Sequence, residues 1–239
     1  MSRKIMVLQH GAWEGPGIFL LETMNKNKVV YEIVEAWRQP LPADLDFDAL
    51  IVLGGSPNVD QEEQYPFLRA EKNFIRKVLA ADRPYFGFCL GHQLLADAFG
   101  AEVKNNVMAG IGFVQGHLTH HGREHPVFKG LPKKFPLFKW HGQAVQNPLP
   151  KNLVLLVTSS ECQVEGISVV DRPHIVGIQF DNHAAATDDV ALFLRKDQRW
   201  LSSTGRNINP DQVIADSTQY GQDIAEQFDT LFSNFLSLL

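Results

Sequence analysis

The sequence predicts an α/β fold: an open, mostly parallel sheet with helices on both faces, extended by antiparallel strands and a helical C-terminal tail. Three observations support this prediction. Short apolar runs alternate with stretches of helical periodicity, which is typical of a parallel sheet covered by helices. Residues 101–180 hold several apolar runs and no long helical stretch, which indicates added antiparallel strands. From Thr187 onward the pattern is helical.

The predicted strands are short apolar runs bounded by polar residues, glycine or proline. In chain order they cover residues 4–9, 29–34, 49–53, 84–88, 112–119, 135–140, 153–158, 163–170 and 174–180.

Helices are predicted where apolar residues recur every three or four positions. One helix is expected over 62–80, a second follows residue 89 and stops at Gly100, and Asn209-Pro210-Asp211 is typical of a helix start in the tail. We expect one domain over residues 1–239, with a core of about 3–185 and a helical extension of about 187–239.

Composition excludes several classes of protein. A net charge of −5, from 22 basic and 27 acidic residues, gives no electrostatic reason to expect nucleic acid or an anionic membrane as a partner. Two cysteines provide neither a disulfide framework nor zinc-type spacing, so no metal or cofactor is expected. The N-terminal apolar run is too short for a signal peptide, and no later run approaches a membrane span. We expect a cytoplasmic protein.

Residues 84–100 place a cysteine on a sharp strand-to-helix turn. Cys89 follows a buried strand, precedes an apolar helix and is flanked by Gly87 and Gly91, the arrangement of a nucleophile elbow. The first amides of the helix have no intrahelical partner, so they favour a thiolate and can hold an oxyanion. The alternative, a small buried core cysteine, leaves the two glycines without a purpose.

A second glycine turn follows the predicted strand 49–53. Ligands gather at the carboxyl ends of strands in open α/β sheets, and the consecutive Gly54 and Gly55 let backbone amides approach a ligand closely. One of these amides, together with the amide of Leu90, is a candidate two-donor oxyanion hole.

The motifs resemble those of the class I glutamine amidotransferases, which have a flavodoxin-like fold. The resemblance covers roughly residues 3–185 and is closest to the stand-alone GMP-synthase-like branch. Its carriers are Leu53-Gly54-Gly55-Ser56, Gly87-Phe88-Cys89-Leu90-Gly91-His92-Gln93, Trp140-His141-Gly142 and Gly177-Ile178-Gln179-Phe180.

This resemblance implies a reaction and roles for the matching residues. The reaction is hydrolysis of the glutamine side-chain amide through a thioester at Cys89, with the Gly55 and Leu90 amides as oxyanion hole. Gln93 would contact the substrate glutamine, and the backbone of His141, Gly142 and Gln143 would help to hold its head group.

The chain departs from the family pattern after Gln179-Phe180. The family has His-Pro-Glu there, whereas this chain has Asp181-Asn182-His183. An ordinary imidazole is better matched to proton transfer near neutral pH than an ordinary aspartate, so turnover is expected to depend on His183 more than on Asp181. Two interpretations follow. Either His183 reaches Cys89 and Asp181 orients it, or the triad is broken and the protein binds with little or no turnover.

Three function hypotheses follow. The protein is a glutaminase that passes ammonia to a separate synthetase partner, a hydrolase of another γ-glutamyl compound, or a silent relative that acts as a binding or regulatory subunit. The sequence holds no phosphate-binding glycine loop of a fused synthetase. His141 is a spare candidate base. The remaining candidates are assigned to structure or solvent: His92, His117, His120, His121, His125 and Cys162.

Overall fold

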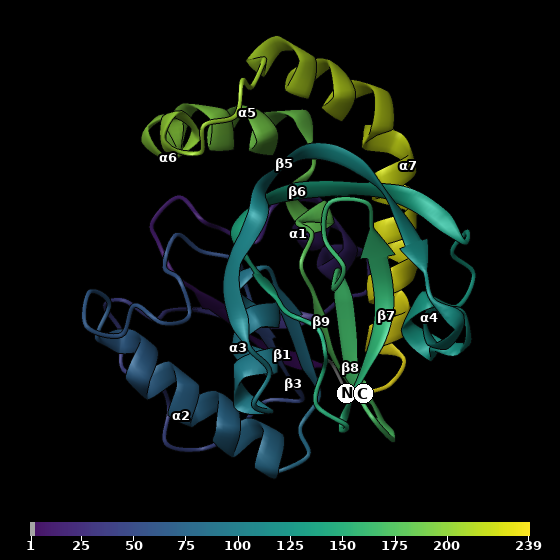
Figure 1. The fold of residues 1–239 in the computed structure, drawn as a ribbon. Helices are drawn as coiled ribbons and strands as arrows, with labels where there is room; N and C mark the ends of the chain where they lie inside the picture. The colour runs from purple at the N-terminus through teal and green to yellow at the C-terminus, as the bar shows by residue number, and fades with distance from the viewer. Residues whose placement is uncertain (1–2) are drawn as a thin grey trace.

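A computed structural model describes residues 3–239, and within this range nine strands form one sheet (Figure 1). The order across the sheet is β2-β1-β3-β4-β9-β8-β7-β5-β6. The strands are β1 (Lys4–Gln9), β2 (Val30–Glu35), β3 (Ala49–Val52), β4 (Tyr85–Phe88), β5 (Val103–Leu118), β6 (Lys134–Val145), β7 (Leu153–Ser159), β8 (Gly166–Val169) and β9 (Arg172–Ile178).

One half of this sheet is parallel and the other is antiparallel. β2, β1, β3, β4 and β9 run in the same direction, with Val52 opposite Gly87 and Phe88 opposite Ile178. The segments that follow β3, β4 and β9 therefore leave the sheet side by side at one edge. From β9 the sheet continues through β8, β7, β5 and β6 in antiparallel pairs.

Helices cover both faces of the parallel half, because its strands are apolar on both faces. Alternate residues such as Phe86 and Phe88 face α1 (Ile18–Lys26) and α7 (Pro210–Leu236), while Tyr85 faces the layer of α2 (Phe67–Ala80) and α3 (Leu90–Ala98). This period-two split is what two buried faces require of a strand.

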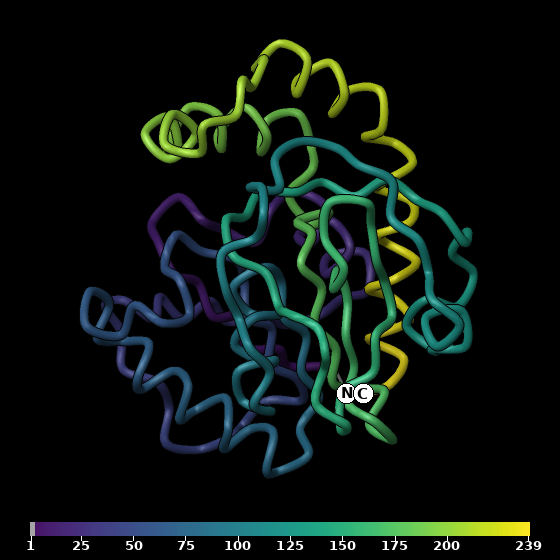
Figure 2. The backbone as a smooth tube through the Cα atoms, in the orientation of Figure 1, coloured from purple at the N-terminus to yellow at the C-terminus, as the bar shows by residue number. Residues whose placement is uncertain are grey.

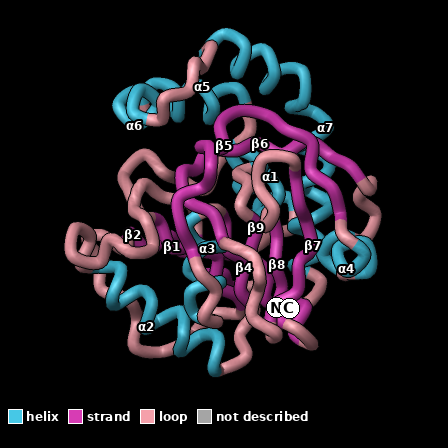
Figure 3. Tube along the Cα trace, viewed as in Figure 1, coloured by secondary structure: helices cyan, strands magenta, loops and turns pink. Residues whose placement is uncertain are grey.

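The tail helices cover the long β5–β6 ribbon. α5 (Thr187–Lys196) and α7 pack on it through a third apolar cluster that includes Phe138, Val190 and Ile224, and α6 (Gln198–Ser203) follows α5. Figure 2 shows the teal ribbon arching below these green and yellow helices. One short helix, α4 (His120–Glu124), and the 3₁₀ turns Pro126–Phe128 and Asn182–Ala184 complete the elements (Figure 3).

All nine predicted strands are present, and the tail is helical as predicted. Asn209 caps α7 by accepting a hydrogen bond from the Asp211 amide at 3.1 Å. Several boundaries were wrong: β6 continues to Val145, β8 begins only at Gly166, and β5 and α2 start elsewhere than predicted. β5 begins at Val103 because the polar residues after it pair with β6 across a register shift, and α2 begins at Phe67 because Pro66 sets the helix start. Helix α1 was not predicted, since it is only nine residues long and follows Gly15-Pro16-Gly17.

Across residues 3–239, no helix combines the length and the apolar character needed to span a bilayer.

Candidate active site

Cys89 lies on the turn between β4 and α3 in a conformation that L-residues seldom adopt, with φ 45° and ψ −101°. Its amide donates to Ile178 O at 2.9 Å, which ties the turn to β9. The flanking glycines are sterically required. A Cβ atom on Gly87 would lie 2.5 Å from the Gly91 carbonyl, and one on Gly91 would collide with Val52 O. Strand, turn and helix therefore meet too closely for any other residue at either position.

A buried histidine holds the Gly54–Gly55 turn. His10 Nδ1 lies 2.9 Å from Gly54 O, and its Nε2 lies 2.8 Å from Glu71 Oε1. Both ring nitrogens face acceptors, so the ring donates from both as an imidazolium. Burial works against this charge, but Glu71 outweighs it and the pKa of His10 is raised. Because the peptide is planar and trans, the Gly55 N–H points away from His10.

The two glycine turns open into one pocket of about 360 Å³. Of the predicted site residues, nine line it: Gly54, Gly55, Cys89, Gln93, His141, Gly142, Gln143, Asp181 and His183. Leu90 is buried directly after the turn, and its backbone amide lowers the pKa of Cys89 against the larger effect of burial.

Of the two residues that replace the family pattern, Asp181 lies beside the cysteine. A Cβ atom on Gly54 would lie 3.3 Å from both Cys89 Cβ and Asp181 Oδ1, so the thiol and the carboxyl share one corner. The same Asp181 oxygen lies 3.9 Å from His183 Nδ1. The His183 ring packs against Phe88 in a tilted arrangement with a centroid distance of 4.1 Å, and no hydrogen bond within residues 3–239 reaches its Nδ1. The order is thiol, carboxyl, imidazole.

Burial sets the proton affinities of this group. It raises the pKa of Cys89 well above its usual value, and the Asp181 charge adds to the rise. Burial also raises the pKa of Asp181 well above the ordinary carboxyl value, and Glu165 adds to that rise while Lys139 opposes it. Burial lowers the pKa of His183 to about 3, so this imidazole is neutral at physiological pH.

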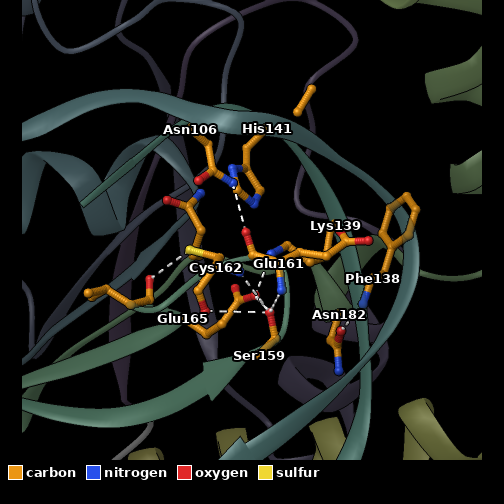
Figure 4. A network of polar contacts seen from close by, with 12 residues as sticks. Asn106, Phe138, Lys139, His141, Ser159, Glu161, Cys162, Glu165 and Asn182 are labelled. Atoms are coloured by element: carbon orange, nitrogen blue, oxygen red, sulfur yellow. Dashed lines mark hydrogen bonds and ion pairs between the residues drawn. The ribbon is translucent and has the colours of Figure 1, made fainter. Parts of the chain in front are cut away.

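A fully buried ion pair lies behind Asp181. Lys139 Nζ contacts Glu165 Oε1, and the same carboxylate accepts a hydrogen bond from Ser159 Oγ at 2.6 Å (Figure 4). Cys162 belongs to this network, not to the pocket. Its Sγ lies 3.5 Å from Val164 O, and burial raises its pKa to about 12.

The floor of the pocket is held by amide side chains. Gln93 Nε2 donates to Gln143 O and to Gln179 Oε1, both at 3.0 Å. His141 Nδ1 also lies 2.8 Å from Gln143 O, and burial lowers the pKa of His141 to about 3. The Gln143 side chain donates to Asp60 Oδ1 at 3.2 Å, while its buried Oε1 has no partner among the described residues.

Several residues of this site do not emerge from the sequence pattern. His10 directly follows β1, which pairs in parallel with β3. The position of His10 at the end of a predicted strand was therefore the signal that could have placed it beside the Gly54–Gly55 turn. Glu14 belongs to no motif, and Lys139 and Glu165 lie within predicted strands. The pocket is also lined by residues of the helical tail, which was expected to lie outside the core: Phe193, Asp197 and Trp200.

The chain matches the family model of the class I glutamine amidotransferases over residues 20–184. It is 31% identical over 130 residues to a glutamine-hydrolysing GMP synthase subunit of Methanosphaera stadtmanae, covering 54% of this chain and 62% of that protein. It is 38% identical over 112 residues to the corresponding protein of Pyrococcus furiosus, covering 47% and 57%. The chain thus matches less than two thirds of the length of these relatives.

The fold is also similar to that of a glutamine amidotransferase from Thermotoga maritima, with a TM-score of 0.87 and 20% identity over 98% of each chain. That likeness extends beyond the family-model region into the helical tail. With its cysteine elbow, its glycine turn and a family match over more than half of its length, the chain belongs to the class I glutamine amidotransferase family.

Proposed function

We propose that this protein hydrolyses a γ-glutamyl amide bond through a thioester on Cys89. The observation that carries the proposal is the shared corner of the pocket, where the Cys89 thiol, the Asp181 carboxyl and the Gly54–Gly55 turn converge. An elbow cysteine beside a proton acceptor and backbone N–H donors has the parts that acyl transfer requires.

In the proposed reaction, the Cys89 thiol gives its proton to Asp181 and the sulfur attacks the γ-carbonyl carbon. The Gly55 and Leu90 amides stabilise the oxyanion. Asp181 then protonates the departing nitrogen, and the C–N bond breaks to leave the thioester. A water molecule attacks the thioester, its proton passes through Asp181 to the sulfur, and glutamate leaves.

We propose Asp181 rather than His183 as the proton acceptor, which reverses the expectation based on ordinary pKa values. Burial supports this assignment, because it raises the pKa of the Asp181 carboxyl well above its ordinary value and lowers the pKa of His183 to about 3, which makes the imidazole a weak base. His183 packs beside the carboxyl, with its Nδ1 3.9 Å from Asp181 Oδ1. Gln93, His141, Gly142 and Gln143, which line the pocket, hold the glutamyl head group.

Glutamine is the simplest substrate for this site, and ammonia would then pass to a separate synthetase partner. The similarity to the glutamine-hydrolysing subunits of GMP synthases supports this partner. We propose a single amidotransferase domain, working without a cofactor in the cytoplasm, where the two free cysteines stay reduced.

The test combines an activity assay with a covalent probe. Purified protein is incubated with glutamine, released glutamate and ammonia are measured, and a glutamine-like diazo ketone is added before peptide mapping. We expect glutamate release and labelling of Cys89 but not of Cys162. Labelling of Cys89 without any turnover would identify a silent binding relative, and preferential labelling of Cys162 would contradict the assignment of the nucleophile.

A further inference from the structure

The pocket has a second side that the proposed reaction does not use. Its side chains come from the β1–α1 loop, from β6 and from the tail helices α5 and α6, and we call them the outer wall: Trp13, Glu14, Trp140, Phe193, Asp197 and Trp200. Segments almost two hundred residues apart in sequence therefore meet around one cavity.

The aromatic members of the outer wall pack on one another. Phe193 stacks on Trp140 with a centroid distance of 5.6 Å, and its edge meets Trp13 at 5.5 Å. Trp200 lies 5.7 Å from Trp140. These rings line the pocket from four segments: the β1–α1 loop, β6, α5 and α6. Indole rings are the best partners among side chains for a cation that approaches a ring face.

Two carboxylates lie among these rings. Trp140 Nε1 donates to Asp197 Oδ2 at 2.7 Å, which fixes this carboxylate at the wall. Glu14 is only 8% exposed, and both hydrogen bonds that hold it, from Ser56 N and Ser56 Oγ, fall on Oε1. Within residues 3–239, no hydrogen bond reaches Glu14 Oε2, which occupies the space that a side chain on Gly11 would fill.

The charge of the pocket is one-sided. Glu14, Asp181 and Asp197 line it, and no lysine or arginine of the described residues does. Burial raises the pKa of Glu14 despite its bonds to Ser56 and the charge of the nearby His10, which does not line the pocket, and the Asp197 charge adds to that rise. Burial also raises the pKa of Asp197. A bound cation would relieve the repulsion between the carboxylates and neutralise buried charge.

We infer that the outer wall binds an ammonium group on the amine portion of the substrate, so that the preferred substrate is a γ-glutamyl amide of an alkyl diamine. This inference rests on the proposed function. The γ-glutamyl head lies on Gln93 and Gln143, the scissile amide lies over Cys89, and the distal ammonium reaches Glu14, Asp197 and the indole faces. Hydrolysis consumes one water molecule and yields glutamate and the free diamine.

The experiment compares three substrates of the full chain: glutamine, γ-glutamyl-n-butylamide and γ-glutamyl-1,4-diaminobutane. The two larger amides are almost identical in shape and differ by the terminal ammonium. Released glutamate is the common readout. We expect kcat/KM for the diamine derivative to exceed that for the butylamide at least tenfold. Glu14→Gln and Asp197→Asn should each bring this ratio toward one, whereas Asp188→Asn, an exposed acid on α5, should leave it unchanged.

Three results would overturn the inference while leaving the proposed function intact. Equal kcat/KM for the two larger amides would show that the outer wall does not recognise the terminal ammonium. If Glu14→Gln lowered kcat/KM equally for both amides, Glu14 would contact the γ-glutamyl portion that they share and not the ammonium group. A preference that survives both substitutions would place the cation elsewhere.

Absence of glutamate from every substrate would contradict the proposed function instead. Binding to the Cys89→Ala variant then decides the inference, since it requires no chemistry. Quenching of tryptophan fluorescence by the diamine derivative at a concentration at least tenfold lower than by the butylamide supports the cation site, and equal concentrations overturn it.

Discussion

The two sides of the pocket differ in what they are made of and in where they come from. The elbow side, with Gly54, Gly55, Cys89 and Asp181, follows the ends of adjacent parallel strands and presents backbone amides and small side chains. The outer wall is built from a loop, the β5–β6 ribbon and the tail, and it presents indoles and carboxylates. In the proposed reaction, the elbow side contacts the γ-glutamyl amide bond that breaks. The outer wall is proposed to contact the amine portion of the substrate.

The largest expected effect tests the chemistry of the elbow side. Asp181→Asn should lower kcat about a hundredfold or more, because general base catalysis contributes at least that much, while KM changes little. His183→Gln, two positions away, should cost less than tenfold if the imidazole only packs beside the carboxyl. Steady-state kinetics of both variants checks this. A greater loss in His183→Gln would return the role of base to the imidazole.

The next effect concerns the glycine turn. A Cβ atom on Gly55 would lie 2.6 Å from His10 Cβ, so Gly55→Ala should displace the turn and its N–H. Loss of one oxyanion donor lowers kcat by about 10² to 10³. The matched control is Gly221→Ala in α7, where a Cβ meets nothing within 4 Å. It should keep full activity and raise the free energy of unfolding by about 1 kcal/mol. Unchanged kcat in Gly55→Ala would exclude this turn from the reaction.

The third effect is a change in the pH dependence of stability, and it comes from His183 on the elbow side. His183 has a pKa of about 3 in the folded protein and about 6.5 when unfolded, so below pH 6.5 the unfolded chain binds a proton that the folded protein does not. Above pH 6.5 the neutral His183 has no effect on how the free energy of unfolding depends on pH. As the pH falls from 6.5 toward 3, protonation of the unfolded chain lowers this free energy. Relative to wild type, His183→Gln should therefore gain about 1–2 kcal/mol between pH 7.5 and pH 5. Urea unfolding at both pH values measures this, and a pH-independent difference would show a charged His183.

The smallest effect lies in the outer wall and has the opposite dependence on pH. The folded pKa of Glu14 is raised, so its ionised form opposes folding and the cost appears as the pH rises above about 4.5. Glu14→Gln keeps an acceptor for the Ser56 amide and removes the charge. At pH 7.5 its Tm should exceed that of wild type by about 2–4 °C, which corresponds to about 1 kcal/mol in a chain of this size. A lower Tm would mean that the neighbouring His10 imidazolium outweighs the cost of burying the Glu14 charge.

The residues of the elbow side could be named from the sequence because their signals are local, and the structure brings them to one pocket. A strand, two glycines and a helix within 17 residues identify Cys89, and adjacent strands bring Gly54 to it. The order of Cys89, Asp181 and His183 was not predictable in this way. Ordinary pKa values favoured His183 as the base, and our proposal of Asp181 depends on burial, which raises the pKa of Asp181 and lowers that of His183.

The outer wall could not be predicted for a different reason. Glu14 and Asp197 are 183 positions apart, and each resembles an ordinary surface acid in its local sequence. Their convergence depends on how α5 and α6 pack over the β5–β6 ribbon. Periodicity indicates that the tail is helical, but it carries no signal for the cavity that the tail encloses.

The long helix α7 limits how far the protein can be truncated from its C-terminus. Its Phe228, Phe232 and Phe235 pack on Phe86 and Phe88 of β4, with ring centroids 5.0 to 6.0 Å apart. β4 is the strand that ends at Cys89, and no residue of α7 lines the pocket. A truncated protein that ends after residue 186 would keep every motif of the family, but it would expose Phe86 and Phe88 of β4 to solvent. We expect this truncated protein to be insoluble, and a grafted tail intended to change the substrate must retain these three phenylalanines.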